Sequence, residues 1–135
     1  MARAIIKKLG DSDEHRPFVA HGSADVLKLG ELTIGRGVFE PGWQWSKDVK
    51  PLAGTEFCEV IHTTCILSGQ LHVKMRDGQE FDLGPGDVAF IPPGHDAWVV
   101  GKEPCRAVDF TGAEDYARIQ EPKEKEEEAQ PSVLQ

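Results

Sequence analysis

Cysteine is scarce in this sequence. The three cysteines, Cys58, Cys65 and Cys105, are an odd number, and no two of them form a Cys-x-x-Cys pair. This argues against a disulfide framework and against a zinc site built from closely spaced cysteines. Each cysteine is therefore interpreted as a free thiol, and two of them as small core residues.

Long apolar segments are also missing. The apolar runs are only a few residues long, far below the roughly 20 residues needed to cross a bilayer. Residues 1–10 lack the apolar centre of a signal peptide. The sequence thus predicts a protein with no membrane partner and a cytoplasmic location.

Basic residues are in the minority, 15 against 23 acidic residues, which gives a formal net charge of −8. Part of this charge sits in residues 121–135, which hold five glutamates against two lysines. No basic stripe is visible in the remainder of the chain. The sequence therefore predicts no nucleic-acid partner.

Turn-forming residues, in contrast, are plentiful, with 14 glycines and 9 prolines. Short apolar runs alternate with turn signals from Val26 onward, which is typical of β-sandwiches and β-barrels. Asp77-Gly78 is the strongest hairpin signal, because a type I′ turn needs a positive φ at both central residues. The predicted strands cover residues 26–29, 32–39, 57–67, 71–75, 80–83, 87–91, 97–100 and 106–110.

One domain with two appended segments is the predicted organisation. Residues 1–24 form an irregular arm that pairs with the barrel or with another subunit, and residues 25–115 form the β-barrel. Residues 116–135 form a short helical turn followed by a disordered acidic tail. Residues 41–55 are interpreted either as a functional loop or lid, or as a packed surface loop.

Two segments resemble the paired motifs of the cupin superfamily. Gly86 and Pro92-Pro93-Gly94 match the Gly, five residues, Pro-x-Gly of its second motif, and Gly69 matches the glycine that ends the first. The resemblance implies an all-β fold, a single cupin-type antiparallel β-barrel (double-stranded β-helix or jelly roll). The run from Pro92 to Trp98 also resembles a subgroup of small bacterial single-domain cupins of unassigned function.

The resemblance implies an altered set of metal ligands. Counting back from Gly69 places His62 at the family's glutamate ligand, and Glu56 and Cys58 at its first two histidine positions. Along one predicted strand these three residues alternate, so they would share a face. Inside a barrel such a polar cluster is costly unless its members are paired or bound to something. Each of the three also has an alternative without a metal. His62 would be a core histidine hydrogen-bonded to a neighbour such as Glu56, Cys58 would be a small apolar core residue, and Glu56 would lie in water at the rim of the barrel.

His95 is the fourth candidate ligand, because the family's last histidine position holds Ala97 instead. Asp96 is expected to orient the His95 ring if His95 points inward. In the other interpretation, His95 and Asp96 form a hydrogen bond that stabilises the loop. Carboxylate, thiolate and imidazole together suit Zn²⁺ and also accept Fe²⁺, Ni²⁺ or Cu²⁺.

Trp43 and Trp45 are the candidates for the wall of a ligand pocket, although core or interface packing is the alternative. Trp98 takes the opposite face from Ala97 and Val99, which argues for packing outside the pocket. Cys58 and His62 would form a nucleophilic pair only if the strand bends, because four residues of straight strand span about 13 Å.

The predicted function is that of a homodimeric cupin that binds a small organic ligand, with a divalent metal held by His62 and some of Glu56, Cys58 and His95. If the protein is an enzyme, the resemblance implies a metal-dependent oxygenase, isomerase or lyase. The alternative is a metal-free, non-catalytic module that binds or senses a ligand.

Overall fold

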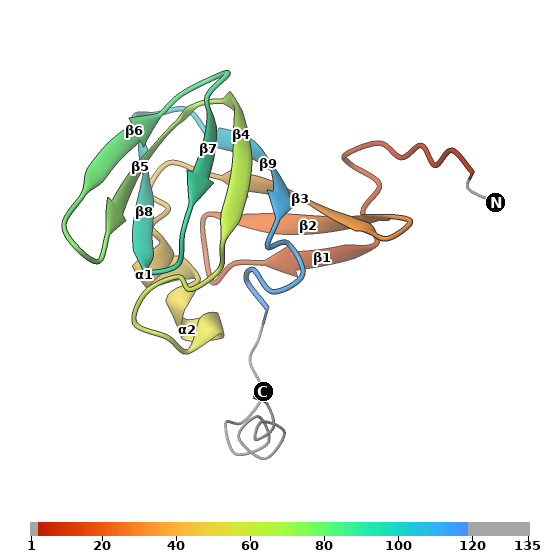
Figure 1. Ribbon diagram of the computed structural model, residues 1–135. Coiled ribbons are helices and arrows are strands. Elements are labelled where there is room, and N and C mark those ends of the chain that lie inside the picture. The colour runs from red at the N-terminus through yellow and green to blue at the C-terminus, as the bar shows by residue number, and fades with distance from the viewer. Residues whose placement is uncertain (1–2, 119–135) are drawn as a thin grey trace, which may run out of the picture.

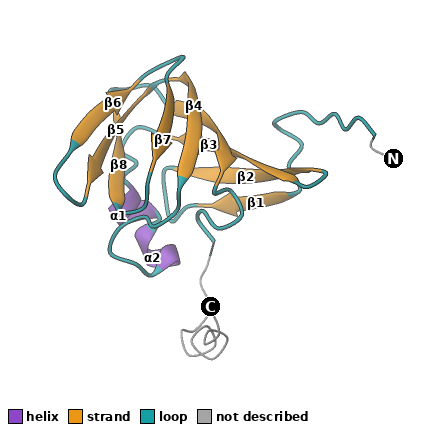
Figure 2. Cartoon of the chain, in the orientation of Figure 1, coloured by secondary structure: helices purple, strands orange, loops and turns teal. Residues whose placement is uncertain are grey.

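Two antiparallel sheets form the fold of residues 3–118, the part of the chain that the computed structural model describes (Figure 1). The larger sheet has the order β1-β2-β3-β9-β4-β7 and the smaller sheet the order β6-β5-β8. The strands are β1 (Glu14–Pro17), β2 (Gly22–Leu29), β3 (Leu32–Phe39), β4 (His62–Ser68), β5 (Gln70–Met75), β6 (Glu80–Leu83), β7 (Val88–Ile91), β8 (His95–Val100) and β9 (Cys105–Thr111). Two short helices, α1 (Trp45–Asp48) and α2 (Lys50–Ala53), lie between β3 and β4 (Figure 2).

Alternation along the strands places the core between the two sheets. In β5 the side chains of Leu71, Val73 and Met75 are buried, whereas the intervening His72 and Lys74 face outward. The hairpin between β5 and β6 turns at Asp77-Gly78, as predicted, but Gly78 alone of the two has a positive φ, 96°, so the turn is not the predicted type I′. Period-two burial and the position of the turn therefore agree with the prediction in this sheet, whereas the turn type does not.

The all-β, cupin-type jelly roll predicted from the sequence is confirmed. Within the described residues, the two sheets remain separate and are not hydrogen-bonded into one closed ring. The molecule is thus a jelly-roll sandwich and not a closed barrel. No helix of the described part is both long and apolar enough to span a bilayer.

The predicted strand over residues 57–67 is wrong in its first half. Strand β4 begins at His62, and Cys58 makes only an isolated bridge to His95. The premise that Glu56, Cys58 and His62 alternate along one extended strand therefore fails.

The N-terminal segment is more regular than expected. Strand β1 and the beginning of β2 fall within residues 1–24, and β1 pairs with β2 in the register Arg16↔Ala24. The arm thus joins the larger sheet of its own chain. At the other end, Tyr116 lies in a turn closed by a hydrogen bond from its N–H to Gly112 O at 3.1 Å. The predicted disordered tail, residues 121–135, lies outside the described residues.

Candidate metal centre

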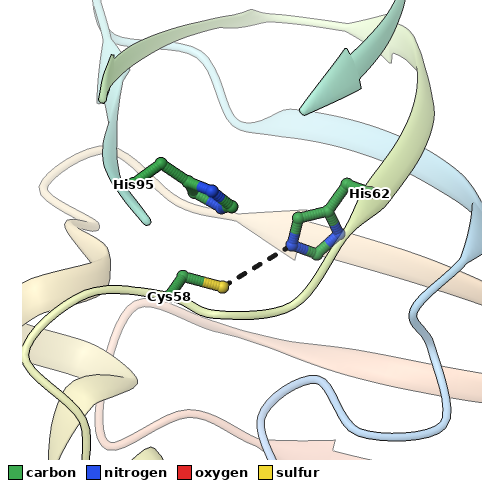
Figure 3. A group of neighbouring side chains, drawn as sticks. All are labelled: Cys58, His62 and His95. Atoms are coloured by element: carbon green, nitrogen blue, oxygen red, sulfur yellow. Dashed lines mark hydrogen bonds between the residues drawn. The ribbon is translucent and has the colours of Figure 1, made fainter. Parts of the chain in front are cut away.

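Three buried side chains meet near one end of the sandwich (Figure 3). They are Cys58, His62 and His95, and their potential ligand atoms all lie within 4.8 Å of one another. Exposed fractions of 2%, 7% and 4% respectively leave each almost out of contact with bulk water. Among the described residues, this is the group of His, Cys, Asp and Glu side chains that can hold a metal ion.

Backbone hydrogen bonds bring Cys58 to this position. The Cys58 N–H donates to His95 O at 2.8 Å, and the Gly94 N–H donates to Cys58 O at 2.8 Å. Because residues 59–61 are irregular, Cys58 Sγ lies 3.7 Å from His62 Nε2. A straight strand would separate the two residues by about 13 Å. The bend that the sequence analysis required for a Cys58–His62 contact is present.

Asp109 orients the His62 ring. Strands β4 and β9 are paired, and Asp109 Oδ2 lies 2.6 Å from His62 Nδ1. With a proton on Nδ1 donated to this carboxylate, Nε2 faces the Cys58 sulfur, as metal-binding histidines are usually held. Asp109 was not among the residues predicted from the sequence. The available signal was its alternation with Cys105 and Ala107, which places a carboxylate on the inward face of the predicted strand.

His95 is held by a different partner from the one expected. Its Nδ1 donates to Pro92 O at 2.9 Å, which leaves Nε2 for the cluster. The expectation that Asp96 orients His95 is wrong. Asp96 instead accepts hydrogen bonds from Gln44 Nε2 at 2.9 Å and from the Ser46 N–H at 3.0 Å, so it ties helix α1 to strand β8.

Hydrogen bonds and charges within the cluster shift the pKa values of His62 and Cys58. Burial alone would lower the pKa of His62, but its hydrogen bonds to Asp109 and Cys58, together with their charges, raise the pKa to about 10. Burial would raise the pKa of the Cys58 thiol, yet hydrogen bonds from His62 and His95 outweigh it and lower the pKa to about 7. Without metal, the site therefore favours a thiolate beside an imidazolium. A metal would displace the proton on His62 Nε2.

Tyr116 covers His62 from the C-terminal side. The two rings are 5.2 Å apart in an edge-on arrangement. Arg16 of β1 fixes this segment, because its Nη1 donates to Ala113 O and to Tyr116 O, both at 2.8 Å. Burial, together with the charges of Cys58 and Asp109, raises the pKa of Tyr116 well above its ordinary value. The phenol is therefore neutral. Tyr116 was also not among the residues predicted from the sequence.

Glu56 does not join the cluster. Its side chain is 76% exposed and lies 3.3 Å from Lys50 Nζ. Because residues 57–61 do not continue β4, Glu56 lies in a loop at the surface and does not project into the sandwich.

A cavity of about 60 Å³ lies beside the cluster. Its walls are mostly apolar and include both predicted pocket tryptophans, Trp43 and Trp45, as well as His62 and His95. Small residues also line the cavity: Ala24, Gly35, Gly37, Ala97, Ala107 and Ala113. Trp98, as expected from its face, packs elsewhere, with its ring 4.7 Å from that of His72.

The spacing of Cys58 and His62 fits two ligands of a tetrahedral metal. With zinc–sulfur bonds near 2.3 Å and zinc–nitrogen bonds near 2.0–2.1 Å, two ligands at a tetrahedral angle lie about 3.6 Å apart. The observed Sγ···Nε2 distance between Cys58 and His62 is 3.7 Å. One thiolate and two imidazoles leave the fourth position of such a metal open, as in catalytic zinc sites.

Several solved structures share this fold. A protein of unknown function from Rhizobium leguminosarum is 20% identical, with a TM-score of 0.58, and the alignment covers 82% of this chain and 98% of that one. The polyketide cyclase RemF from Streptomyces resistomycificus is 19% identical (TM-score 0.55; 81% and 78% covered). A cupin-superfamily sugar phosphate isomerase from Silicibacter pomeroyi is 20% identical (TM-score 0.56; 76% and 71% covered).

Sequence comparison finds a family match for the central part of the chain. No curated protein matches the sequence. Residues 59–111, however, match the family described as the cupin domain. This segment runs from the loop after Cys58 to the end of β9, and so includes His62, His95 and Asp109. Together with the jelly-roll architecture, the match supports the assignment of this chain to the cupin superfamily.

Proposed function

We propose that this protein is a metal-binding cupin in which Cys58, His62 and His95 hold one divalent metal ion at the edge of a small ligand cavity. The observation that carries the proposal is the convergence of three buried ligand atoms within 4.8 Å. Cys58 and His62 are close in the chain, but His95 comes from strand β8, so chain proximity alone does not explain the meeting of all three. Burying such groups together is costly unless they are paired or bound.

Zinc is the metal that the ligand set favours. Thiolates select zinc or copper(I), and imidazoles accept zinc, copper, iron and nickel, so zinc suits all three ligands. Zinc has no redox chemistry of its own and would act as a Lewis acid on a ligand in the cavity. We therefore favour an isomerase or lyase over an oxygenase, which would require bound iron or copper.

The chain's own residues would prepare the site for this chemistry. Asp109 fixes His62 with Nε2 directed to the cluster, and Pro92 O does the same for His95. Trp43, Trp45 and Tyr116 exclude water and supply apolar wall. The similar structures carry different activities, so the fold alone does not select the reaction.

A reducing compartment suits this site, because Cys58 must remain a free thiol to bind metal. We propose a cytoplasmic location for this reason. A disulfide or an oxidised sulfur at Cys58 would remove one of the three ligands.

Elemental analysis of untagged protein tests the metal site. We expect about one zinc per chain after purification in zinc-containing buffer, and loss of that zinc in His62→Ala and Cys58→Ala. The matched controls are His72→Ala, on the outer face of β5, and Cys105→Ala, which is buried away from the cluster. Iron or copper in place of zinc would redirect the proposal to an oxygenase. Absence of every metal, or equal zinc in His62→Ala, would refute it.

The same geometry favours a second candidate, a metal-free thiol nucleophile. Cys58 Sγ, His62 and Asp109 form a chain with separations of 3.7 Å and 2.6 Å, the order of groups found in cysteine–histidine catalytic sites. Metal-free protein tests this alternative with iodoacetamide. Rapid alkylation of Cys58 that slows in Asp109→Ala, in a protein that never takes up metal, would favour the nucleophile. Protection of Cys58 by one equivalent of zinc would favour the metal centre.

A further inference from the structure

Three residues that line the cavity have a buried polar side-chain atom without a hydrogen-bond partner among the described residues. They are Asp109, with the acceptor Oδ1, Trp43, with the donor Nε1, and Arg36, with the donor Nε. The first two concern the ligand that the cavity could bind. A buried polar atom without a partner costs stability comparable to a lost hydrogen bond, so each such atom in a folded protein calls for an explanation.

The free oxygen of Asp109 is oriented by the cluster itself. Because Oδ2 is occupied by His62 Nδ1 at 2.6 Å, the carboxylate is fixed and Oδ1 is left over. Gly35 is the cross-strand partner of Asp109, and a Cβ at Gly35 would lie 2.9 Å from Ala113 Cβ and 3.4 Å from Asp109 Cβ. Glycine at position 35 therefore lets Ala113 pack closely beside Asp109.

The indole of Trp43 is fixed by aromatic packing. Its ring lies 4.5 Å from that of Phe39 and 5.8 Å from that of Phe18, and only 3% of the residue is exposed. Indole nitrogens in protein interiors usually find an acceptor. The Trp43 N–H is therefore a donor available to a molecule within the cavity.

Arg36 is the third of these residues, and its guanidinium contacts an acidic side chain of the neighbouring strand β2. It alternates with Gly35 and Gly37, pairs in register with Asp25, and its Nη2 lies 3.4 Å from Asp25 Oδ2. Gly35 and Gly37 pair with Asp109 and Ala107 on the inner face, so Arg36 points to the outer one. The guanidinium of Arg36 is thus paired with Asp25, whereas the partner of the Asp109 carboxylate is His62.

The size of the cavity limits its occupant. A dry protein cavity of about 150 Å³ is known to hold benzene, a molecule of six carbons. At about 60 Å³ this cavity is less than half as large. It suits a molecule, or the reacting end of one, with about three to five non-hydrogen atoms.

We propose that the cavity recognises a small neutral molecule bearing a hydroxyl group, which donates its proton to Asp109 Oδ1 and offers an oxygen to Trp43 Nε1. This inference rests on the proposed function, since the molecule would lie beside the proposed metal. To the proposed metal site it adds the chemical class of the ligand. A ligand without a hydroxyl proton, such as a ketone or a carboxylate, would leave Asp109 Oδ1 without a hydrogen bond.

Three molecules of equal size test the proposal. 2-Propanol offers a donor and an acceptor, acetone only an acceptor, and acetate a negative charge, and each has four non-hydrogen atoms. The probe signal is the indole N–H resonance of Trp43, one of three tryptophans, assigned by its loss in Trp43→Phe. From NMR titrations of the full chain without metal we expect 2-propanol to bind about tenfold tighter than acetone, and tighter than acetate, which also has no hydroxyl proton to donate to Asp109 Oδ1.

Asp109→Asn provides the decisive variant. The asparagine oxygen still accepts from His62 Nδ1, so its NH₂ group replaces Oδ1 and turns an acceptor into a donor. The preference should disappear or reverse, with acetone binding at least as tightly as 2-propanol. In Trp43→Phe, both probes should weaken together, because each loses the same donor. Binding of this variant is followed by saturation transfer from the protein to the probe.

Each outcome has a defined meaning. An unchanged preference in Asp109→Asn, or no binding of 2-propanol by the wild-type protein, would overturn the proposal. The titrations are run on metal-free and zinc-treated protein, with zinc content measured separately. A protein that takes up no zinc but prefers 2-propanol contradicts the metal centre alone. A protein that binds zinc but shows no preference contradicts the ligand class alone.

Discussion

On the outer face of β5, neighbouring side chains change the pKa of His72. Its Nδ1 lies 2.7 Å from Asp82, its Nε2 lies 2.6 Å from Glu80, and its ring packs on Trp98. Hydrogen bonds to Asp82 and then to Glu80 raise the pKa of His72 above its ordinary value of 6.5. The cross-strand register His72↔Asp82 accounts for the first of these contacts.

We expect the NMR titration midpoint of His72 to lie above 6.5, and to fall in Asp82→Asn. Because the folded-state pKa is the higher one, the stabilisation is complete below about pH 6.5 and is lost as the pH rises through the raised value. The effect on stability should be small, as for other exposed ion pairs. Glu103→Gln, in an exposed loop, is the control and should leave the midpoint unchanged. A midpoint of 6.5 in the wild-type protein would contradict the assignment.

At the scale of elements, the turn before β8 positions the candidate centre. Gly94 has a φ of 95°, and its N–H donates to Cys58 O. A Cβ at this position would lie 2.9 Å from Arg76 Nη1, which is the flexible end of a side chain bonded to Glu59. The left-handed backbone is therefore the main reason for glycine here.

Gly94→Ala should lower the free energy of unfolding by about 1–3 kcal/mol, the cost of a left-handed conformation for a residue with a side chain. It should also weaken zinc binding, because the turn holds Cys58 against His95. Gly86→Ala is the matched control, with a φ of 88° and open space around the added Cβ. We expect thermal denaturation to show a loss in both variants, and zinc titration to show a loss in Gly94→Ala alone. Equal zinc affinity in the two variants would argue against a positioning role for this turn.

The strands could be predicted from the sequence more fully than the candidate metal centre. Strands Leu32–Phe39 and Glu80–Leu83 match the predicted ranges, because alternation and turn residues define them locally. The break before His62 could not be seen, since residues 57–67 contain the β-branched and aromatic residues of one long strand. Yet this break brings Cys58 to His62.

The partnership of His62 with Asp109 depends on long-range register. The two residues are 47 positions apart, and the β4–β9 pairing shifts between Thr63 and Thr64 and again between Ile66 and Ser68. Local patterns do not specify such shifts. The alternation within each strand was visible in the sequence, whereas the residues that would face each other across strands were not.

At the scale of the whole molecule, self-association remains a prediction. Trp43 and Trp45 are 3% and 2% exposed, so two of the tryptophans expected to anchor a partner are already covered within one chain. The remaining argument is the edge strand β7, where Val88 and Phe90 are 68% and 66% exposed. An apolar edge strand is open to pairing with a second copy of the chain.

We expect light scattering to give the mass of a dimer, and Phe90→Lys to give a monomer, because a charge on an edge strand blocks edge-to-edge pairing. Leu32→Lys is a control, since Leu32 is similarly exposed, at 63%, but begins the interior strand β3. A monomeric wild-type protein would refute the predicted homodimer. A dimer that survives Phe90→Lys would place the interface away from β7.

The hydrogen bonds from Arg16 to Ala113 and Tyr116 join residues 97 and 100 positions apart. Tyr116 follows strands β1 to β9 in the chain, so it is synthesised after all three candidate ligands. The cover over His62 is thus the last part of the described site to be added, and it is fastened by Arg16 to the first strand of the fold.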